Sequence, residues 1–227
     1  MSAPIRIGLV GASGRMGGTL LNLLSTDAEL AKRFEVVWKS QRQGAVKLEV
    51  ACPQVVIDFS SPTGTLAVAA ECAKNKIPLL VCTTGFSVNE EKQLHDILST
   101  SVWAWEPNTS LGVKALHLAL ESVAKVLPGF EISMREVHHA HKKDKPSGTA
   151  KALLATLQKF LPKSNPVREI PVDSLREGEV IGVHSVIFEG PEETLEIKHI
   201  AHDRKLFARG ALELAAQLLK KSVTSER

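Results

Sequence analysis

A short strand that runs directly into a glycine-rich turn constrains the fold of this chain most strongly. Residues 5–10, IRIGLV, are almost all apolar and predict a buried strand. The turn GASGRMG follows at once, and leucines at helical spacing after it predict a helix. Glycines let such a turn approach a pyrophosphate, which the N–H groups of the helix start can bind. The unit therefore predicts dinucleotide binding. Its spacing, G-x-x-G-x-x-G, departs from the strict G-x-G-x-x-G, and a tight turn without a ligand is the alternative.

Four more apolar runs repeat this pattern along the first hundred residues. They lie at 34–38, 55–59, 78–82 and 102–105, and each predicts a strand that ends in a polar turn. Strands that alternate with helices predict an α/β fold, here a Rossmann-like, doubly wound parallel sheet. Ligands of such sheets bind beyond the carboxyl ends of the strands. We therefore expect the turns GASGRMG, DFSSP, CTTG and PNTS to form one rim.

The end of the second predicted strand bears on the choice of dinucleotide. An acidic residue there commonly binds the ribose 2′-hydroxyl of NAD. This chain reads Lys39-Ser40-Gln41-Arg42 without an acid, so Lys39 and Arg42 could receive a 2′-phosphate instead. We expect NADPH to be used at least as well as NADH. A basic loop in solvent is the alternative.

The second half of the chain predicts a different kind of domain. Residues 111–127 and 150–161 are apolar at helical spacing, and 130–137, 180–189 and 194–200 predict strands, the last two joined by a hairpin-like turn. A closing helix is expected at 208–219. We therefore expect a dinucleotide-binding domain at 1–109 and an α+β domain at 110–204, with a mixed sheet, for substrate binding and oligomerisation. The C-terminal helix, 205–227, would return to the first domain.

The segment 136–150, EVHHAHKKDKPSGTA, combines proton donors with anion-binding groups. It holds three histidines and three lysines, and after Pro146 the residues Ser147-Gly148-Thr149 predict a helix start. Histidine can transfer a proton near neutral pH, while lysine and a helix N-terminus attract a carboxylate. A solvated basic loop is the alternative. His141, Lys143 and Lys145 are expected to be bystanders in either case.

Composition excludes several classes of protein. The net charge of +3 over 227 residues is too small to indicate nucleic-acid binding, and its local clustering favours a small acidic ligand. Three cysteines without metal-ligand spacing predict a reducing cytoplasm and no metal site. No apolar run approaches the length of a membrane span. Cys82 follows four apolar residues, which favours a buried strand end over a nucleophile.

The motifs GASGRMG, DFSSP, CTTGF, PNTSLGV and EVHHAHKKDKPSGTA together resemble the dihydrodipicolinate reductase family, as does the ending LEIKHIAHDRKLFARGAL. The resemblance covers most of the chain. It implies NAD(P)H-dependent reduction of dihydrodipicolinate to tetrahydrodipicolinate in lysine and diaminopimelate biosynthesis. It also implies a homotetramer joined through the second-domain sheets, with a small dicarboxylate as substrate.

The resemblance also implies roles for individual residues. His138 would donate the proton and Lys142 would be the catalytic lysine. The remaining substrate-binding residues would be His139, Ser147, Gly148, Thr149 and Thr84. The residues that would bind the cofactor are Gly11, Ala12, Ser13, Gly14, Arg15, Met16, Lys39, Arg42, Cys82, Thr83, Thr84, Glu106, Pro107, Asn108 and Thr109.

The chain departs from the family pattern in two places, and one geometric question stays open. Gln41 stands where relatives usually have an acid, and the segment between the second and third strands is short, which affects the adenine pocket. Successive strand residues point to opposite faces, so His138 and His139 can serve one pocket only if the strand ends there. Two other functions remain alternatives: a semialdehyde dehydrogenase, which would need a nucleophilic cysteine, and a non-catalytic nucleotide sensor.

Overall fold

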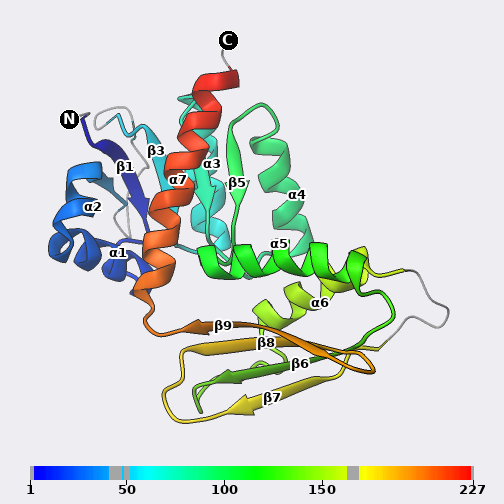
Figure 1. Cartoon of the computed structure of the whole chain (residues 1–227). Coiled ribbons are helices and arrows are strands. Elements are labelled where there is room, and N and C mark those ends of the chain that lie inside the picture. The colour runs from blue at the N-terminus through cyan, green and yellow to red at the C-terminus, as the bar shows by residue number, and fades with distance from the viewer. Residues whose placement is uncertain (1–2, 41–47, 49–51, 163–168, 226–227) are drawn as a thin grey trace. The chain divides into compact units, whose positions relative to one another are not determined.

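The chain folds into two compact units. A computed structural model describes residues 3–40, 48, 52–162 and 169–225 (Figure 1). The first unit contains Met1–Thr109 together with Lys205–Arg227, and the second contains Ser110–Arg204. The chain thus leaves the first unit after five strands and comes back to it for its last helix.

The first unit is built on a parallel sheet of five strands. Their order across the sheet is β2-β1-β3-β4-β5, and every pairing is parallel. The strands are β1 (Ile5–Val10), β2 (Phe34–Lys39), β3 (Val55–Asp58), β4 (Leu79–Val81) and β5 (Trp103–Trp105). The strand order reverses direction between β1 and β3, and ligands of open parallel sheets bind at such a switch point. The Rossmann-like sheet expected from the sequence is confirmed.

Helices pack on both faces of this sheet because its strands are apolar on both sides. In β3, Val55 and Ile57 lie in one buried cluster, whereas Val56 between them lies in the other. The first cluster receives side chains from three helices, α1 (Arg15–Thr26), α2 (Ala28–Arg33) and α7 (Lys205–Ser225); the second receives them from α3 (Pro62–Lys74) and α4 (Val88–Ile97). Helix α2 is too short and polar to have been expected from the sequence.

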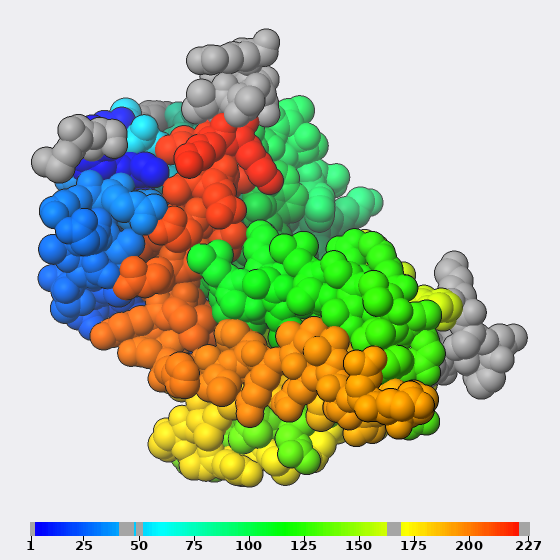
Figure 2. All heavy atoms as spheres, in the orientation of Figure 1, coloured from blue at the N-terminus to red at the C-terminus, as the bar shows by residue number. Residues whose placement is uncertain are grey.

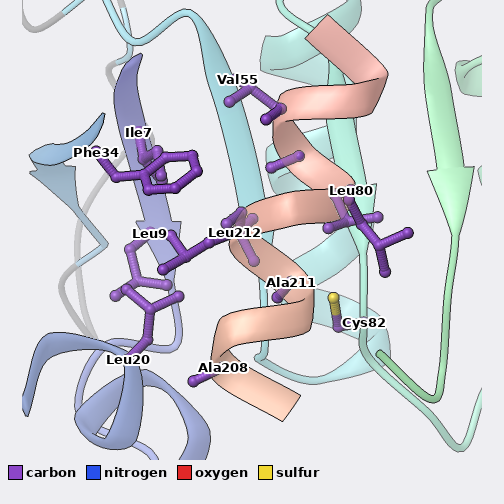
Figure 3. Close-up of a cluster of buried hydrophobic side chains, with 14 of the residues drawn as sticks. Ile7, Leu9, Leu20, Phe34, Val55, Leu80, Cys82, Ala208, Ala211 and Leu212 are labelled. Carbon is purple, nitrogen blue, oxygen red and sulfur yellow. The ribbon is translucent and has the colours of Figure 1, made fainter. Parts of the chain in front are cut away.

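Helix α7 completes the first of these clusters. Ala208, Ala211 and Leu212 lie among Leu9, Leu80 and other buried residues (Figure 3). The small alanines bring the helix close to the strands. Two ion pairs hold the same helix at its edge. Both terminal guanidinium nitrogens of Arg33 donate to the Glu213 carboxylate, at 2.6 and 2.8 Å, and Arg209 donates to the Asp27 carboxylate at 2.7 Å.

The second unit is a four-stranded mixed sheet with two helices. The strand order is β7-β6-β8-β9; β6 and β7 are parallel and the other pairs are antiparallel. The elements are α5 (Leu111–Val126), β6 (Glu131–His138), α6 (Gly148–Phe160), β7 (Val172–Arg176), β8 (Gly182–Glu189) and β9 (Thr194–Ala201). Strand β7, with the sequence VDSLR, was missed because it carries only two apolar residues.

One face of the mixed sheet carries the core of the second unit. Alternate residues of β6 and β8, among them Ile132, Met134, Val186 and Phe188, pack against α5 and α6. Glu136 and His138 continue the same alternation along β6, so they lie on this helix-facing side too. The strand therefore delivers two polar groups into a buried environment just beyond the apolar core.

The helix boundaries follow from local capping. Ser87 and Glu90 form a capping box at α4, with the Ser87 N–H donating to Glu90 Oε2 at 2.8 Å. Helix α6 begins at Gly148, at the helix start predicted for Ser147–Thr149, because Ser147 Oγ accepts a hydrogen bond from the Ala150 N–H at 3.1 Å. Within the described ranges, no helix is both long and apolar enough to cross a bilayer.

Candidate active site

The glycine turn after β1 packs too closely for any other residue at two positions. Gly11 has φ +75°, and a Cβ there would lie 2.4 Å from the carbonyl oxygen of Phe59 at the end of β3. A Cβ on Gly17 would lie 2.3 Å from the carbonyl oxygen of Gly11. The turn is closed by a hydrogen bond of 2.9 Å from the Gly14 N–H to the Gly11 carbonyl. Gly11 and Gly17 therefore hold α1 close to the switch point.

The start of α1 is suited to an anion. Gly14 is the N-cap residue and supplies no side-chain hydrogen bond, and the first turn contains no acidic residue. Ser13, Gly14 and Arg15 are exposed, while Gly11, Ala12 and Met16 are half-buried. The six residues predicted to hold the pyrophosphate thus surround a helix N-terminus whose first N–H groups have no side-chain cap.

The end of β2 contacts the glycine turn through a residue that sequence reasoning did not single out. Ser40 Oγ accepts a hydrogen bond from the Gly11 N–H at 3.0 Å. Lys39 precedes it, is exposed and ends β2. Arg42, the other expected phosphate ligand, lies outside the described residues, as does most of the short segment after it.

A buried carboxylate, Asp58, ties the ends of β3 and β4 together. It is 0% exposed and accepts hydrogen bonds from the Ser60 N–H at 3.0 Å and from Thr83 Oγ1 at 2.9 Å. Thr65 Oγ1 of α3 donates to it as well. Burial raises the pKa of Asp58, and these hydrogen bonds oppose that rise. Asp58 thereby fixes two turns of the rim, although the sequence did not mark it as functional.

An apolar pocket of about 200 Å³ opens at the same rim, within the first unit. Six residues line it: Met16, Phe59, Cys82, Pro107, Thr109 and Phe207. Four of them were predicted cofactor ligands, whereas Phe59 and Phe207 were not. Thr109 Oγ1 donates to the Phe207 carbonyl at 2.7 Å and so joins the β5 turn to α7. A planar ring such as nicotinamide fits a pocket of this size and polarity.

The other predicted residues of this rim lie around the pocket rather than in its wall. Thr83 is buried and bonded to Asp58, and Thr84 beside it is exposed. Glu106 and Asn108 are half-buried. Burial raises the pKa of the Cys82 thiol well above its ordinary value, so the thiol stays protonated and is a poor nucleophile.

The second unit contains a buried polar cluster centred on Glu136. Its carboxylate is 0% exposed, accepts hydrogen bonds of 3.1 Å from the Ser147 N–H, and lies 3.1 Å from Arg176 Nη2. Two histidines face it: His138 Nδ1 at 3.7 Å and His184 Nε2 at 3.8 Å from Oε2. Within the part of the chain that is described, His138 Nδ1 and His184 Nδ1 are buried without a hydrogen-bond partner.

The cluster sets different protonation states for its members. Burial works to raise the pKa of Glu136, but hydrogen bonds from Ser147 and Arg176 outweigh it and hold that pKa below its ordinary value. Burial lowers the pKa of His138, Glu136 opposes this, and Lys142 and Arg176 lower the pKa further. Burial and the charge of His138 lower the pKa of His184 to about 4. At neutral pH, His184 is therefore neutral beside an ionised Glu136.

Strand β6 stops between the two neighbouring histidines, His138 and His139. Strand β6 ends at His138, and the chain turns at once, with the Lys142 N–H donating to the His139 carbonyl at 3.1 Å. His138 is buried with Glu136, whereas His139 is half-buried and its ring lies 6.4 Å from that of His141. The alternation rule of a strand thus stops applying between His138 and His139.

The predicted anion-binding residues lie at the end of the same segment. Lys142 is half-buried, Ser147 is buried as the N-cap of α6, and Gly148 and Thr149 follow in its first turn. A Cβ on Gly148 would meet nothing within 4 Å, so space is open beside it. Lys142 Nζ lies 2.8 Å from Asp144 Oδ1.

Two residues of this cluster were missed by sequence reasoning. His184 lies on β8, far along the chain from the segment 136–150, and Arg176 lies on strand β7, which the sequence pattern did not predict. The signal that places them is strand register, because His184 pairs with Glu136 and Arg176 pairs with His138. Donor atoms of Glu136, His138 and His184 lie within 4.8 Å of one another, a spacing that a metal ion could use, but Arg176 and Ser147 already bind the carboxylate.

Comparison with known proteins supplies the family. Residues 5–109 match the model of the N-terminal part of dihydrodipicolinate reductase, and residues 112–225 match its C-terminal part. The chain belongs to the dihydrodipicolinate reductase family. The resemblance noted from the motifs is thereby confirmed for nearly the whole chain, and the family is one of oxidoreductases.

Individual relatives agree with this assignment. The chain is 36% identical to the 4-hydroxy-tetrahydrodipicolinate reductase of Xanthomonas axonopodis pv. citri, over 100% of this chain and 97% of the relative. It is 33% identical to that of Nitratidesulfovibrio vulgaris (strain DP4), over 96% and 94%. The dipicolinate-bound dihydrodipicolinate reductase of Paenisporosarcina sp. TG-14 has the same fold, with a TM-score of 0.79 at 20% identity, over 96% of this chain and 95% of that one.

Proposed function

We propose that this chain reduces dihydrodipicolinate, the dehydrated form of 4-hydroxy-tetrahydrodipicolinate, to tetrahydrodipicolinate in lysine and diaminopimelate biosynthesis. The observation that carries the proposal is the cluster of the second unit: a buried histidine at the end of a strand, close to Lys142 and to the start of α6. A cyclic imine dicarboxylate needs a hydride, a proton and cations for its carboxylates. A bound reduced nicotinamide supplies the hydride.

The first unit is proposed to bind the dinucleotide. Gly11 to Met16 would hold the pyrophosphate at the start of α1, where uncapped N–H groups and the absence of first-turn acids favour an anion. The pocket lined by Cys82, Pro107 and Thr109 would receive the nicotinamide, with Thr83, Thr84, Glu106 and Asn108 at its edge. Lys39, which is exposed, and Arg42 would contact a 2′-phosphate, which makes NADPH at least as good as NADH.

The second unit is proposed to bind the substrate and protonate it. His138 gives its proton to the ring carbon that becomes carbanion-like as hydride arrives. Lys142 and the first turn of α6, with Ser147, Gly148 and Thr149, bind a carboxylate, and His139 supports it. The positive charges of Lys142 and Arg176 lower the pKa of His138, and a bound dianion offsets them, so that substrate binding itself favours the protonated acid.

The open face of the mixed sheet is proposed to join the subunits of a homotetramer. Strand register aligns one apolar residue from each strand in a row on the side opposite Glu136: Leu175, Val137, Val183 and Ile200. Ile200 is 45% exposed and the other three are half-buried. This apolar row supports the proposal, because apolar side chains at a surface favour contact with another subunit. Val183→Lys should split the assembly, as light scattering would show; a monomeric unaltered protein would overturn the proposal.

A coupled assay tests the activity. Dihydrodipicolinate synthase generates the unstable substrate in place, and the fall in absorbance of NADPH or NADH reports its oxidation. We expect oxidation that depends on the synthase and is inhibited by dipicolinate, the ligand of the Paenisporosarcina structure. The Michaelis constants for NADPH and NADH then test the cofactor proposal, which a strong preference for NADH would overturn. Oxidation no faster than background would leave only a nucleotide-binding function.

A further inference from the structure

The residue proposed to bind a substrate carboxylate already holds a carboxylate of this chain. Lys142 Nζ lies 2.8 Å from Asp144 Oδ1, and the two side chains are 23% and 50% exposed. The pair therefore sits at the edge of the polar cluster, where water or a ligand can reach the Asp144 side.

Two N–H groups at the start of α6 already have partners within the chain. The Ser147 N–H is bound by Glu136, and the Ala150 N–H by Ser147 Oγ. Lys142 lowers the pKa of Asp144 against a smaller effect of burial, and the Gly148 N–H lowers it further. Asp144 thus pairs with Lys142, the cation that would receive an external carboxylate, and lies four residues before Gly148, the first residue of α6.

Arg176 holds the backbone at Lys142 and Asp144 in place through their carbonyl oxygens, rather than through the two side chains. Arg176 Nε donates to the Lys142 carbonyl at 3.2 Å, and Arg176 Nη2 donates to the Asp144 carbonyl. Arg176 is itself held by Glu136 at 3.1 Å. Asp144 can therefore leave Lys142 by rotating its side chain alone. Both of its chain neighbours, Lys143 and Lys145, are exposed, so the displaced carboxylate enters water beside positive charge.

We infer that Asp144 is a displaceable internal carboxylate that occupies the substrate's carboxylate site and lowers the affinity of that site for dicarboxylates. The inference rests on the proposed function, in which Lys142 and α6 bind substrate. A ligand must replace the Lys142–Asp144 pair before it binds, and the same competition acts on the product, which carries both carboxylates too. Asp144 keeps Lys142 from standing unpaired while no substrate is present.

Calorimetric titration of dipicolinate into the full-length protein with saturating NADPH tests this. Asp144→Asn removes the competing charge but keeps the side chain's shape, so dipicolinate should bind about two- to fivefold more tightly, the range expected for a half-exposed ion pair. Asp173→Asn is the matched control: the Asp173 side chain is 52% exposed, close to the 50% of Asp144, and pairs with Arg135 at 3.2 Å on the other face of the sheet. Its dipicolinate affinity should stay unchanged.

A double-mutant cycle separates local competition from a general charge effect. In a Lys142→Gln background, Asp144→Asn should no longer tighten binding, because the competed cation is gone. An equal gain in both backgrounds would overturn the inference, as would unchanged or weaker binding by Asp144→Asn alone, which would make Asp144 a positioning residue for Lys142. If the unaltered protein fails to bind dipicolinate while it still binds NADPH, the proposed substrate site fails, and the inference with it.

Discussion

The imidazole rings of His138 and His184 lie edge to face, with centroids 5.0 Å apart and planes at 73°. They come from neighbouring strands, and both face the carboxylate of Glu136. Burial first, and then the charge of His138, lower the pKa of His184 to about 4. A proton that enters this pair therefore goes to His138. The geometry separates His138, the proposed proton donor, from a neutral neighbour, a distinction that residue type alone does not make.

Replacement of His138 tests its proposed role as proton donor. His138→Gln should lower kcat by about 10²- to 10⁴-fold, the usual contribution of a positioned acid. NADPH affinity, measured by fluorescence titration, should stay the same because the proposed dinucleotide site lies in the first unit. His141→Gln is the control, since His141 is exposed beyond the end of β6, and its kcat should be that of the unaltered enzyme. A kcat of His138→Gln equal to that of the unaltered enzyme would contradict the proposed role of His138 as proton donor.

The pH dependence of the reaction should report the same group. Burial first, and then Lys142 and Arg176, lower the pKa of His138 below 6.5, so the free enzyme loses its acid as pH rises through that lowered value. We expect kcat/KM to fall about tenfold per pH unit on the alkaline side. The alkaline fall of kcat should lie at higher pH than that of kcat/KM, because a bound dianion raises the pKa of His138. If kcat and kcat/KM fell at the same pH, substrate binding would not raise the pKa of His138 and the prediction would be wrong.

His184 should make the protein less stable in mild acid. Its pKa is about 4 in the folded chain and about 6.5 when unfolded, so the unfolded state binds more protons between these values. The stability from this group is present above pH 6.5 and falls progressively toward pH 4, by up to about 3 kcal/mol. Urea unfolding at a series of pH values should show a smaller acid loss for His184→Gln. Identical pH slopes for both proteins would count against the buried neutral histidine.

Two adjacent glycines of α1 give a matched pair of substitutions. Gly17→Ala places a Cβ 2.3 Å from the Gly11 carbonyl, so it should cost about 1–3 kcal/mol in the free energy of unfolding and weaken NADPH binding. Gly18→Ala meets nothing within 4 Å and should stabilise the helix by about 0.5–1 kcal/mol. Urea unfolding and dinucleotide titration measure both effects. If the two variants had the same free energy of unfolding and the same NADPH affinity, the close packing of Gly17 against the turn would not matter for stability or binding.

The first unit was predictable from the sequence because its signals are local. Each parallel strand is a short apolar run, each turn after it is polar, and Ser87 and Glu90 mark a helix start within four residues. Polar turns at strand ends must gather at one edge of a parallel sheet, so the rim followed as well. Helix α2 and strand β7 escaped because short, polar elements form through their neighbours rather than through a periodic pattern.

The sequence by itself determined the family and the Rossmann-like sheet, and it singled out the segment 136–150, which we propose as the chemical centre of the second unit. Only the tertiary structure decided which residues surround His138. Glu136, Arg176 and His184 meet because strand register places distant positions side by side, and register depends on how whole strands pack. Their protonation follows from burial, which no local pattern encodes. The same holds for Asp144. Its neighbours along the chain are lysines, but only the fold shows that its carboxylate forms an ion pair with Lys142.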